Sequence, residues 1–199
     1  MPFIAWRIER AAHVALAVFC LVGHCLGQGT VTITFEGPPA QPPGTYSVIS
    51  RYSGSGMLFT APYMLLEGSG LAGGPDNGTT YLATLLNTTL PVNSLSGAPF
   101  SMTSFDVAGF YGLLTPPTLQ VVGFRQDGTT VTNSFTSIGT SFQTVHLDSG
   151  FVGLNTVDLT GGFAFDNMVV GIPEPSASGL ILLGTLYGLG RAWMRGRQP

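Results

Sequence analysis

The sequence predicts an all-β fold, an antiparallel β-sandwich of jelly-roll type over residues 28–171, with a barrel as the alternative. Short runs of Val, Ile, Thr and Phe alternate with polar residues, and turn residues separate these runs at regular intervals. No apolar periodicity typical of a helix continues over three turns in this region. The 28 Gly and 14 Pro among 199 residues suit a fold with many turns.

Residues 1–27 have the composition of a secretory signal. Two arginines lie near the start, an apolar run follows over residues 11–26, and cleavage is expected between Gly27 and Gln28. We expect a signal helix that directs export through the inner membrane, with an uncleaved membrane anchor as the alternative. Both cysteines of the chain lie in this segment, so the mature protein would have no disulfide and no thiolate ligand.

The expected strands of the domain begin with residues 30–36, where polar and apolar residues alternate without interruption. Residues 100–110 predict a longer strand with a bulge, because the apolar phase shifts between Met102 and Phe105. Asp127-Gly128 separates two β-rich runs and predicts a hairpin in which both turn residues take positive φ. The other expected strands are residues 46–52, 57–60, 63–67, 79–86, 119–126, 129–136, 142–148, 154–159 and 163–170, with loops at residues 38–44 and 68–78 and residues 81–86 as the nearest helix candidate.

Residues 172–199 form a second segment outside the domain and have three parts. Pro173, Glu174 and Pro175 come first, and the two prolines hold the chain extended so that a protease can grip it. An apolar run suited to a single transmembrane helix follows, and an arginine cluster closes the chain on the cytoplasmic side. The expected anchor comprises Gly179, Leu180, Ile181, Leu182, Leu183, Leu186, Tyr187 and Leu189, followed by Arg191, Arg195 and Arg197.

This tail resembles the PEP-CTERM sorting signal over residues 172–197, with a Pro-Glu-Pro motif, a short apolar helix and an Arg-rich end in the same order. In Gram-negative bacteria that signal is recognised by an exosortase, a membrane transpeptidase-like protease, and such bacteria typically make exopolysaccharide. The resemblance implies a protein that is exported, transiently membrane-anchored and processed, and then remains at the cell surface or in the extracellular matrix of a biofilm. A plain C-terminal membrane anchor is the alternative.

The domain between the two ends is acidic, because its two arginines are outnumbered by eight carboxylates, a net charge of −6. The chain has seven basic residues, all of them arginine, and its overall net charge is −3. These charges argue against a nucleic-acid partner, since binding to phosphates needs clustered Lys and Arg.

Oxygen ligands in the domain favour a hard cation over zinc, since the domain has no cysteine and a single histidine. Glu36 ends the first expected strand, and Asp166 and Asn167 lie in the last. In jelly rolls of the carbohydrate-binding type, the first and last strands often lie close together and hold a structural Ca²⁺. We therefore expect Glu36, Asp166 and Asn167 as calcium candidates and no other cofactor; the alternative is that they are solvated strand-edge residues.

Two further functions are alternatives to a non-enzymatic surface protein. A lectin-like module would stack sugars on aromatic rings, and residues 163–170 resemble the last strand of secreted carbohydrate-binding sandwiches. Both tryptophans lie outside the domain, so the candidate rings are Tyr46, Tyr52, Tyr63, Tyr81 and Tyr111. A secreted hydrolase would use His146 or paired carboxylates. The chain has no Gly-x-Ser-x-Gly motif, and His146 alternates with apolar neighbours in an expected strand, so we expect no enzymatic activity.

Overall fold

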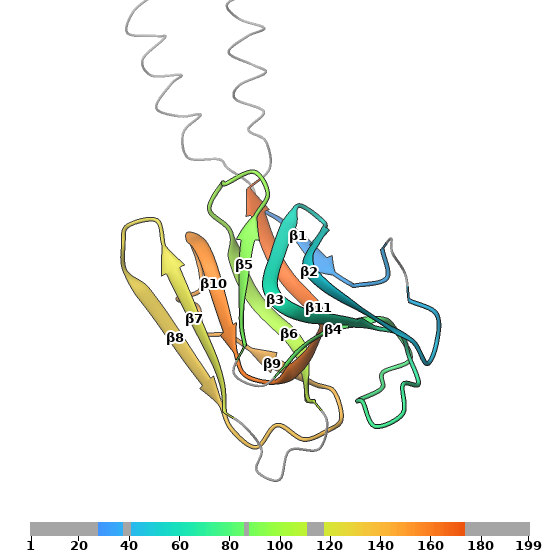
Figure 1. Ribbon diagram of the computed structural model, residues 1–199. Helices are drawn as coiled ribbons and strands as arrows, with labels where there is room; N and C mark the ends of the chain where they lie inside the picture. Colours follow the sequence, from blue (N-terminus) through green and yellow to red (C-terminus); the bar gives the residue numbers. More distant parts are fainter. Residues whose placement is uncertain (1–27, 38–40, 86–87, 111–117, 174–199) are drawn as a thin grey trace, which may run out of the picture. The chain divides into compact units, whose positions relative to one another are not determined.

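The computed structural model describes residues 28–37, 41–85, 88–110 and 118–173, which form eleven strands (Figure 1). The strands are β1 (Gln28–Ile33), β2 (Tyr46–Gly54), β3 (Met57–Glu67), β4 (Tyr81–Thr84), β5 (Thr89–Ser94), β6 (Ser101–Gly109), β7 (Leu119–Arg125), β8 (Thr130–Phe135), β9 (Gln143–His146), β10 (Leu154–Thr160) and β11 (Phe163–Pro173). The all-β class is therefore confirmed.

The compact unit that carries these strands spans Gly29–Ile172. Within the described residues, no helix has the length and apolarity needed to cross a membrane. The expected signal helix with Gly27, the motif residues Glu174 and Pro175, and the expected C-terminal anchor lie outside the described residues.

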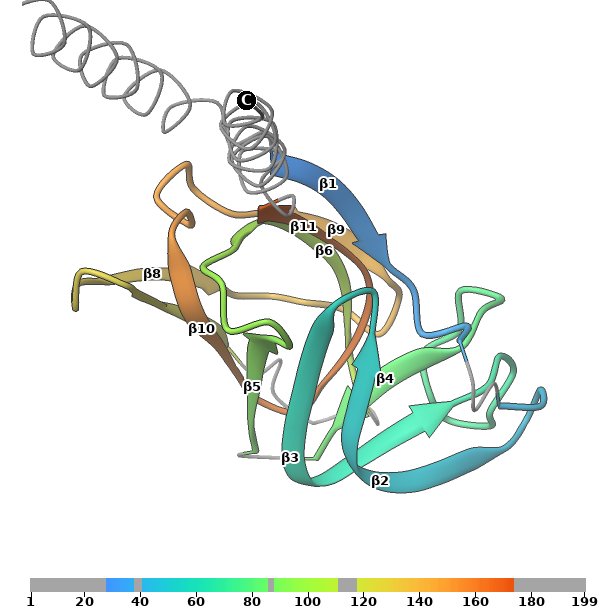
Figure 2. The same ribbon diagram turned by 90° about the horizontal axis from the view of Figure 1, so that it is seen from above.

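The strands are hydrogen-bonded into one sheet, in the order β8-β7-β10-β5-β3-β4-β11-β6-β9, with β2 beside β3 and β1 beside β11. Seen from above, this sheet curls so that two arms face each other (Figure 2). One arm contains β8, β7, β10, β5, β3 and β2, and the other contains β4, β11, β6 and β9 with β1. The expected antiparallel all-β fold is thus confirmed, and its strands form one curled sheet. The two arms still pack face to face, as the layers of a sandwich do.

Strand β3 belongs to both arms because it bends in the middle. Its first three residues pair with β5, and residues 64–67 pair with β4. The residues between these two ladders include Pro62, which has no N–H to donate. Opposite β2 the register shifts between Ile49 and Arg51, where β3 contributes two extra residues. The two strands expected at residues 57–60 and 63–67 are therefore one bent strand.

Residues 81–84 form the central strand β4, as the strand expected at residues 79–86 predicts, so the helix alternative is wrong for these residues. Residues 89–94 form β5, which the sequence did not predict because a proline within an apolar run argues against a strand. Pro91 is accommodated because it lies opposite Asp158 of β10, beyond the residues through which β5 pairs with β3.

The hairpin between β7 and β8 is confirmed, but its turn is of a different type from the one expected. Gly128 has φ of 81°, whereas Asp127 is not among the residues with positive φ. The N–H of Gly128 donates to the carbonyl of Arg125 at 3.1 Å, and the N–H of Arg125 donates to the carbonyl of Thr129 at 2.9 Å. This longer loop needs a single residue in the left-handed region, so Asp127 is free to accept hydrogen bonds from Thr129.

The core lies between the two arms and is rich in aromatic rings. Phe35, Tyr52 and Phe59 form a cluster with ring centroids 5.1, 5.4 and 6.0 Å apart, which joins the segment after β1 to β2 and β3. Pairs of this kind contribute about 0.5–1.5 kcal/mol beyond the area that they bury. The cluster thus fixes the segment that carries Glu36 against the hairpin that carries Tyr46 and Tyr63.

Candidate functional site

Asp166 holds the loop before β4 against the last strand. Only 1% of this residue is exposed. Its carboxylate accepts three hydrogen bonds, from Asn77 Nδ2 at 2.7 Å, Thr79 Oγ1 at 2.8 Å and the Asn167 N–H at 2.8 Å. Burial raises the pKa of Asp166, and these hydrogen bonds oppose that increase.

Glu36 binds the same loop from the other side. It accepts a hydrogen bond of 2.6 Å from the N–H of Thr80, the residue after Thr79. Burial and then the charges of Glu36 and Asp166 raise the pKa of Tyr52, which lies near both carboxylates. Glu36 therefore does not end the first strand as expected but lies in the turn after β1, which ends at Ile33. Glu36 and Asp166 of β11 accept hydrogen bonds from two adjacent residues of one loop.

Asn167 connects β11 to β6. The register shifts between Asp166 and Val169 by one extra residue in β11, and Asn167 takes a φ of 46° there. The Asn167 amide donates to Asp106 Oδ2 at 2.8 Å, and Thr144 of β9 donates to the other oxygen of Asp106 at 2.5 Å. The bulge expected in β6 is also present, because Thr103 is an extra residue between Met102 and Ser104.

These contacts provide a structural role for all three calcium candidates. Within the described residues, no group of three or more His, Cys, Asp or Glu side chains could hold a metal ion. Two donors from the loop, Asn77 and Thr79, occupy Asp166 Oδ2, and the N–H of Asn167 in β11 occupies Oδ1. The calcium site therefore stays a prediction. In the structure, the carboxylates of Glu36 and Asp166 bind the loop at residues 77–80.

His146, the hydrolase candidate, lies exposed on β9 opposite Ser104 of β6. The carboxylate of Asp148, two residues later, accepts a hydrogen bond from Asn133 at 2.6 Å, and its N–H donates to the same side chain at 2.9 Å. No carboxylate hydrogen-bonded to His146 is found among the described residues. The described part of the chain thus gives His146 no orienting acid.

Glu67 is a fully buried carboxyl group at the end of β3, opposite Tyr81 of β4. Its Oε2 accepts a hydrogen bond of 2.6 Å from the Tyr81 hydroxyl, while its Oε1 has no partner within the described residues. Burial raises the pKa of Glu67, and the bond from Tyr81 opposes that increase. Tyr81 also packs edge-on against Phe142.

The structure separates the tyrosines that the sequence grouped as sugar-stacking candidates. Tyr52 and Tyr81 are buried and serve the core and the buried carboxyl group, so their expected role is corrected. Tyr111 lies outside the described residues. Tyr46 and Tyr63 are 56% and 62% exposed, and Val48 beside them is 60% exposed. These three residues, here called the aromatic patch, lie on the hairpin of β2 and β3.

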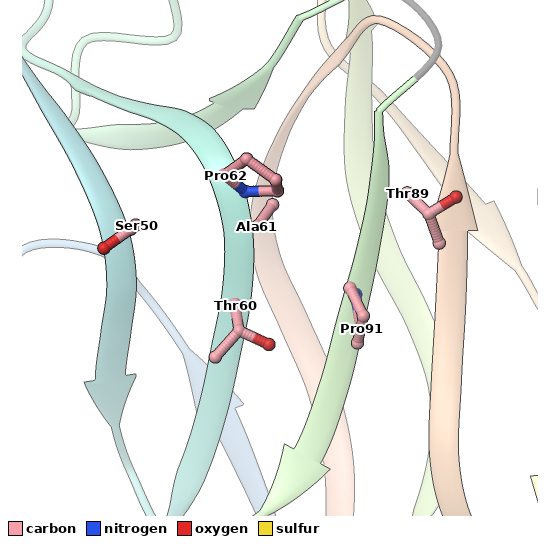
Figure 3. Close-up of a pocket in the computed structure, with 6 residues that line it drawn as sticks. All are labelled: Ser50, Thr60, Ala61, Pro62, Thr89 and Pro91. Atoms are coloured by element: carbon pink, nitrogen blue, oxygen red, sulfur yellow. The ribbon is translucent and has the colours of Figure 1, made fainter.

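A shallow depression opens where β3 bends away from β5 (Figure 3). It is lined by hydroxyl groups and proline rings from three strands: Ser50 of β2, Thr60, Ala61 and Pro62 of β3, and Thr89 and Pro91 of β5. The depression and the aromatic patch share β2 and β3, and Pro62 of the depression directly precedes Tyr63 along the chain. Sequence reasoning missed these residues, although the two strand prolines marked where a ladder is interrupted.

No family model and no curated protein matches this sequence. Solved structures similar to the chain include a mutant of CBM29-2, a family 29 carbohydrate-binding module, complexed with mannohexaose. It has a TM-score of 0.38 and 12% identity, covering 72% of this chain and 92% of that chain. A second CBM29-2 mutant, complexed with cellulohexaose, has a TM-score of 0.39 and 11% identity over 73% and 92%. An agarase has a TM-score of 0.37 and 9% identity over 75% and 25%. Similarity at these TM-scores assigns neither a family nor a ligand to this chain.

Proposed function

We propose that the chain is an exported surface or matrix protein whose β domain binds polysaccharide without cleaving it. The observation that carries this proposal is the aromatic patch. Tyr46 and Val48 are successive outward residues of β2, and Tyr63 lies on the neighbouring strand. A tyrosine ring offers an apolar face to a sugar ring and a hydroxyl group to its edge.

The surroundings of the aromatic patch support glycan binding. The depression, which shares β2 and β3 with the patch, offers the hydroxyl groups of Ser50, Thr60 and Thr89, which can donate to or accept from sugar hydroxyls. Large exposed side chains normally occur singly on a soluble protein, so three on one hairpin indicate a binding surface. His146 lacks an orienting acid within the described residues, which favours binding over hydrolysis.

Isothermal titration of the full chain in mild detergent against soluble polysaccharides tests the proposal. Tyr63→Ala and Tyr46→Ala are expected to weaken binding at least about tenfold each, as anchor residues of an interface do. Leu95→Ala, at a residue 50% exposed beyond the end of β5, is the matched control and should bind as the wild type. Wild-type protein that binds no polysaccharide, or tyrosine variants that bind normally, would contradict the proposal.

The sequence of the tail supports a second part of the proposal, sorting by an exosortase. Strand β11 ends at Pro173, the first residue of the Pro-Glu-Pro motif, so the motif begins where the last strand ends. Mass spectrometry of the protein released by cells that contain an exosortase tests this part. We expect a C-terminus near the Pro-Glu-Pro motif and loss of processing in Glu174→Ala. Released protein that ends at Pro199 would refute it.

A further inference from the structure

The arm made of β2, β3, β5, β10, β7 and β8 has an outer face on which residues of neighbouring strands stand in register. Buried residues such as Val92, Val157 and Val121 point into the core, so the residues that alternate with them form this outer face. Its central row consists of Arg51, Thr60, Pro91, Asp158, Val122 and Thr132. The row on one side consists of Ser53, Leu58, Asn93, Thr156, Phe124 and Thr130. The row on the other side consists of Thr89, Thr160, Gln120 and Ser134.

This outer face is polar but nearly uncharged. Most of its side chains carry a hydroxyl or an amide group, and some of these already bond across strands, as Thr156 does to Asn93 Oδ1 at 2.7 Å. Its charged residues are Arg51 and Asp158. Six strands at a spacing of about 4.8 Å extend over roughly 24 Å, enough for several sugar residues in a row.

Asp158 lies near the centre of this face and is half-buried between Pro91 and Val122. Burial alone raises the pKa of Asp158, and no hydrogen bond from another described residue opposes it. Arg51 is three strands away, about 14 Å by strand spacing, which exceeds the screening length at physiological salt. The half-buried carboxylate of Asp158 thus keeps acceptor oxygens available to the hydrogen-bond donors of a bound molecule.

We propose that this outer face binds an uncharged polysaccharide, whose hydroxyl groups donate hydrogen bonds to Asp158. The inference rests on the polysaccharide binding proposed above and names the class of glycan. An anionic polysaccharide would bring its own carboxylates beside Asp158 and against a domain of net charge −6, so it is repelled. Paired sugar hydroxyls supply the donors that the described residues around Asp158 do not.

The depression of Figure 3 lies within this face, since Thr60, Thr89 and Pro91 belong to both. A glycan that occupies the depression can therefore continue across β3 and β5 to Asp158. In this arrangement the aromatic patch holds the sugar rings, and the carboxylate selects ligands without negative charge.

Isothermal titration of the full chain against a soluble neutral β-glucan, a neutral galactomannan and a polyuronate tests the inference. Asp158→Asn keeps the shape of the side chain but removes its charge, and it should weaken binding of the neutral polymer about tenfold. The matched control, Asp127→Asn, removes the same charge at the β7–β8 turn, where asparagine also suits the turn. It should bind as the wild type. The melting temperature of Asp158→Asn should equal or exceed that of the wild type, because the half-buried charge is gone.

The outcomes separate the two proposals. If the wild type binds no polymer, the polysaccharide-binding function fails, and the inference fails with it. If the wild type binds the polyuronate as well as or better than the neutral polymers, or if Asp158→Asn binds neutral polymers normally, the inference is overturned while the binding function stands. Equal weakening by Asp158→Asn and Asp127→Asn would also overturn it, because the effect would then come from net charge.

Discussion

Removal of one hydroxyl group, in Tyr81→Phe, tests the physical account of the buried carboxyl group. The Tyr81 hydroxyl donates the only described side-chain hydrogen bond to Glu67, and its O···O distance of 2.6 Å is typical of an O–H···O⁻ bond. Phenylalanine keeps the edge-on contact with Phe142, whose ring centroid lies 5.3 Å away. The substitution therefore leaves both oxygens of a fully buried carboxylate without a partner among the described residues.

The expected loss follows from the charge of the acceptor. A hydrogen bond to an ionised group contributes about 1.5–3 kcal/mol, so Tyr81→Phe should lower the free energy of unfolding by about 2 kcal/mol near pH 8. Near pH 4, below the ordinary glutamate value of 4.5, the carboxyl group is protonated in both states. The bond then joins neutral groups, and its loss should cost about 1 kcal/mol.

Urea unfolding followed by circular dichroism at both pH values measures these losses. Tyr63→Phe is the matched control, because it removes the same hydroxyl from a residue that is 62% exposed and should change stability by less than about 0.5 kcal/mol. A penalty for Tyr81→Phe that is absent near pH 8, or as large near pH 4, would refute the reasoning.

Three further predictions concern the same region. Gly74→Ala should cost about 1–3 kcal/mol, because its Cβ would lie 2.8 Å from the Tyr81 hydroxyl, whereas Gly139→Ala meets nothing within 4 Å and should be neutral in the same urea assay. Burial raises the pKa of Asp166 above its ordinary 3.8, so the folded state binds this proton more tightly than the unfolded state does. The stabilisation from that difference is complete below 3.8 and lost as pH rises through the raised value, so the wild-type pH profile of unfolding should slope downward there. Asp166→Ala should make that slope shallower, and the raised pKa values of Glu67 and Asp158 account for the slope that remains. Millimolar calcium should raise the melting temperature of the wild type but not of Glu36→Gln; an unchanged wild-type midpoint would contradict the calcium prediction.

The strand pattern was predictable where local alternation alone decides it. Residues 119–126 and 129–136 alternate regularly and contain β7 and β8, and residues 30–36 overlap β1, which begins and ends earlier in the chain than expected. The prediction failed where proline interrupts a run, because the sequence does not show whether a neighbouring strand needs the missing N–H. At Pro62 and Pro91 the ladder between β3 and β5 has already ended, so the proline is tolerated.

The candidate site was less predictable than the strands. The sequence predicted that the carboxylates of the first and last strands would converge, and Glu36 and Asp166 do bind adjacent residues, Thr80 and Thr79. It did not reveal that a loop occupies the space between them. It also could not show that Asp158 stands near the centre of the outer face, because that depends on which strands lie on either side of β10.

The sequence by itself determined the all-β class, the acidic charge of the domain and the presence of two distinctive ends, because these depend on composition and short-range pattern. Only the tertiary structure decided which tyrosines are exposed and which carboxylates have partners. Alternation divides a strand into two faces, but cross-strand neighbours such as Tyr81 and Glu67 are set by pairing between distant parts of the chain. That pairing depends on the bend in β3 and the curl of the whole sheet, which no local pattern encodes.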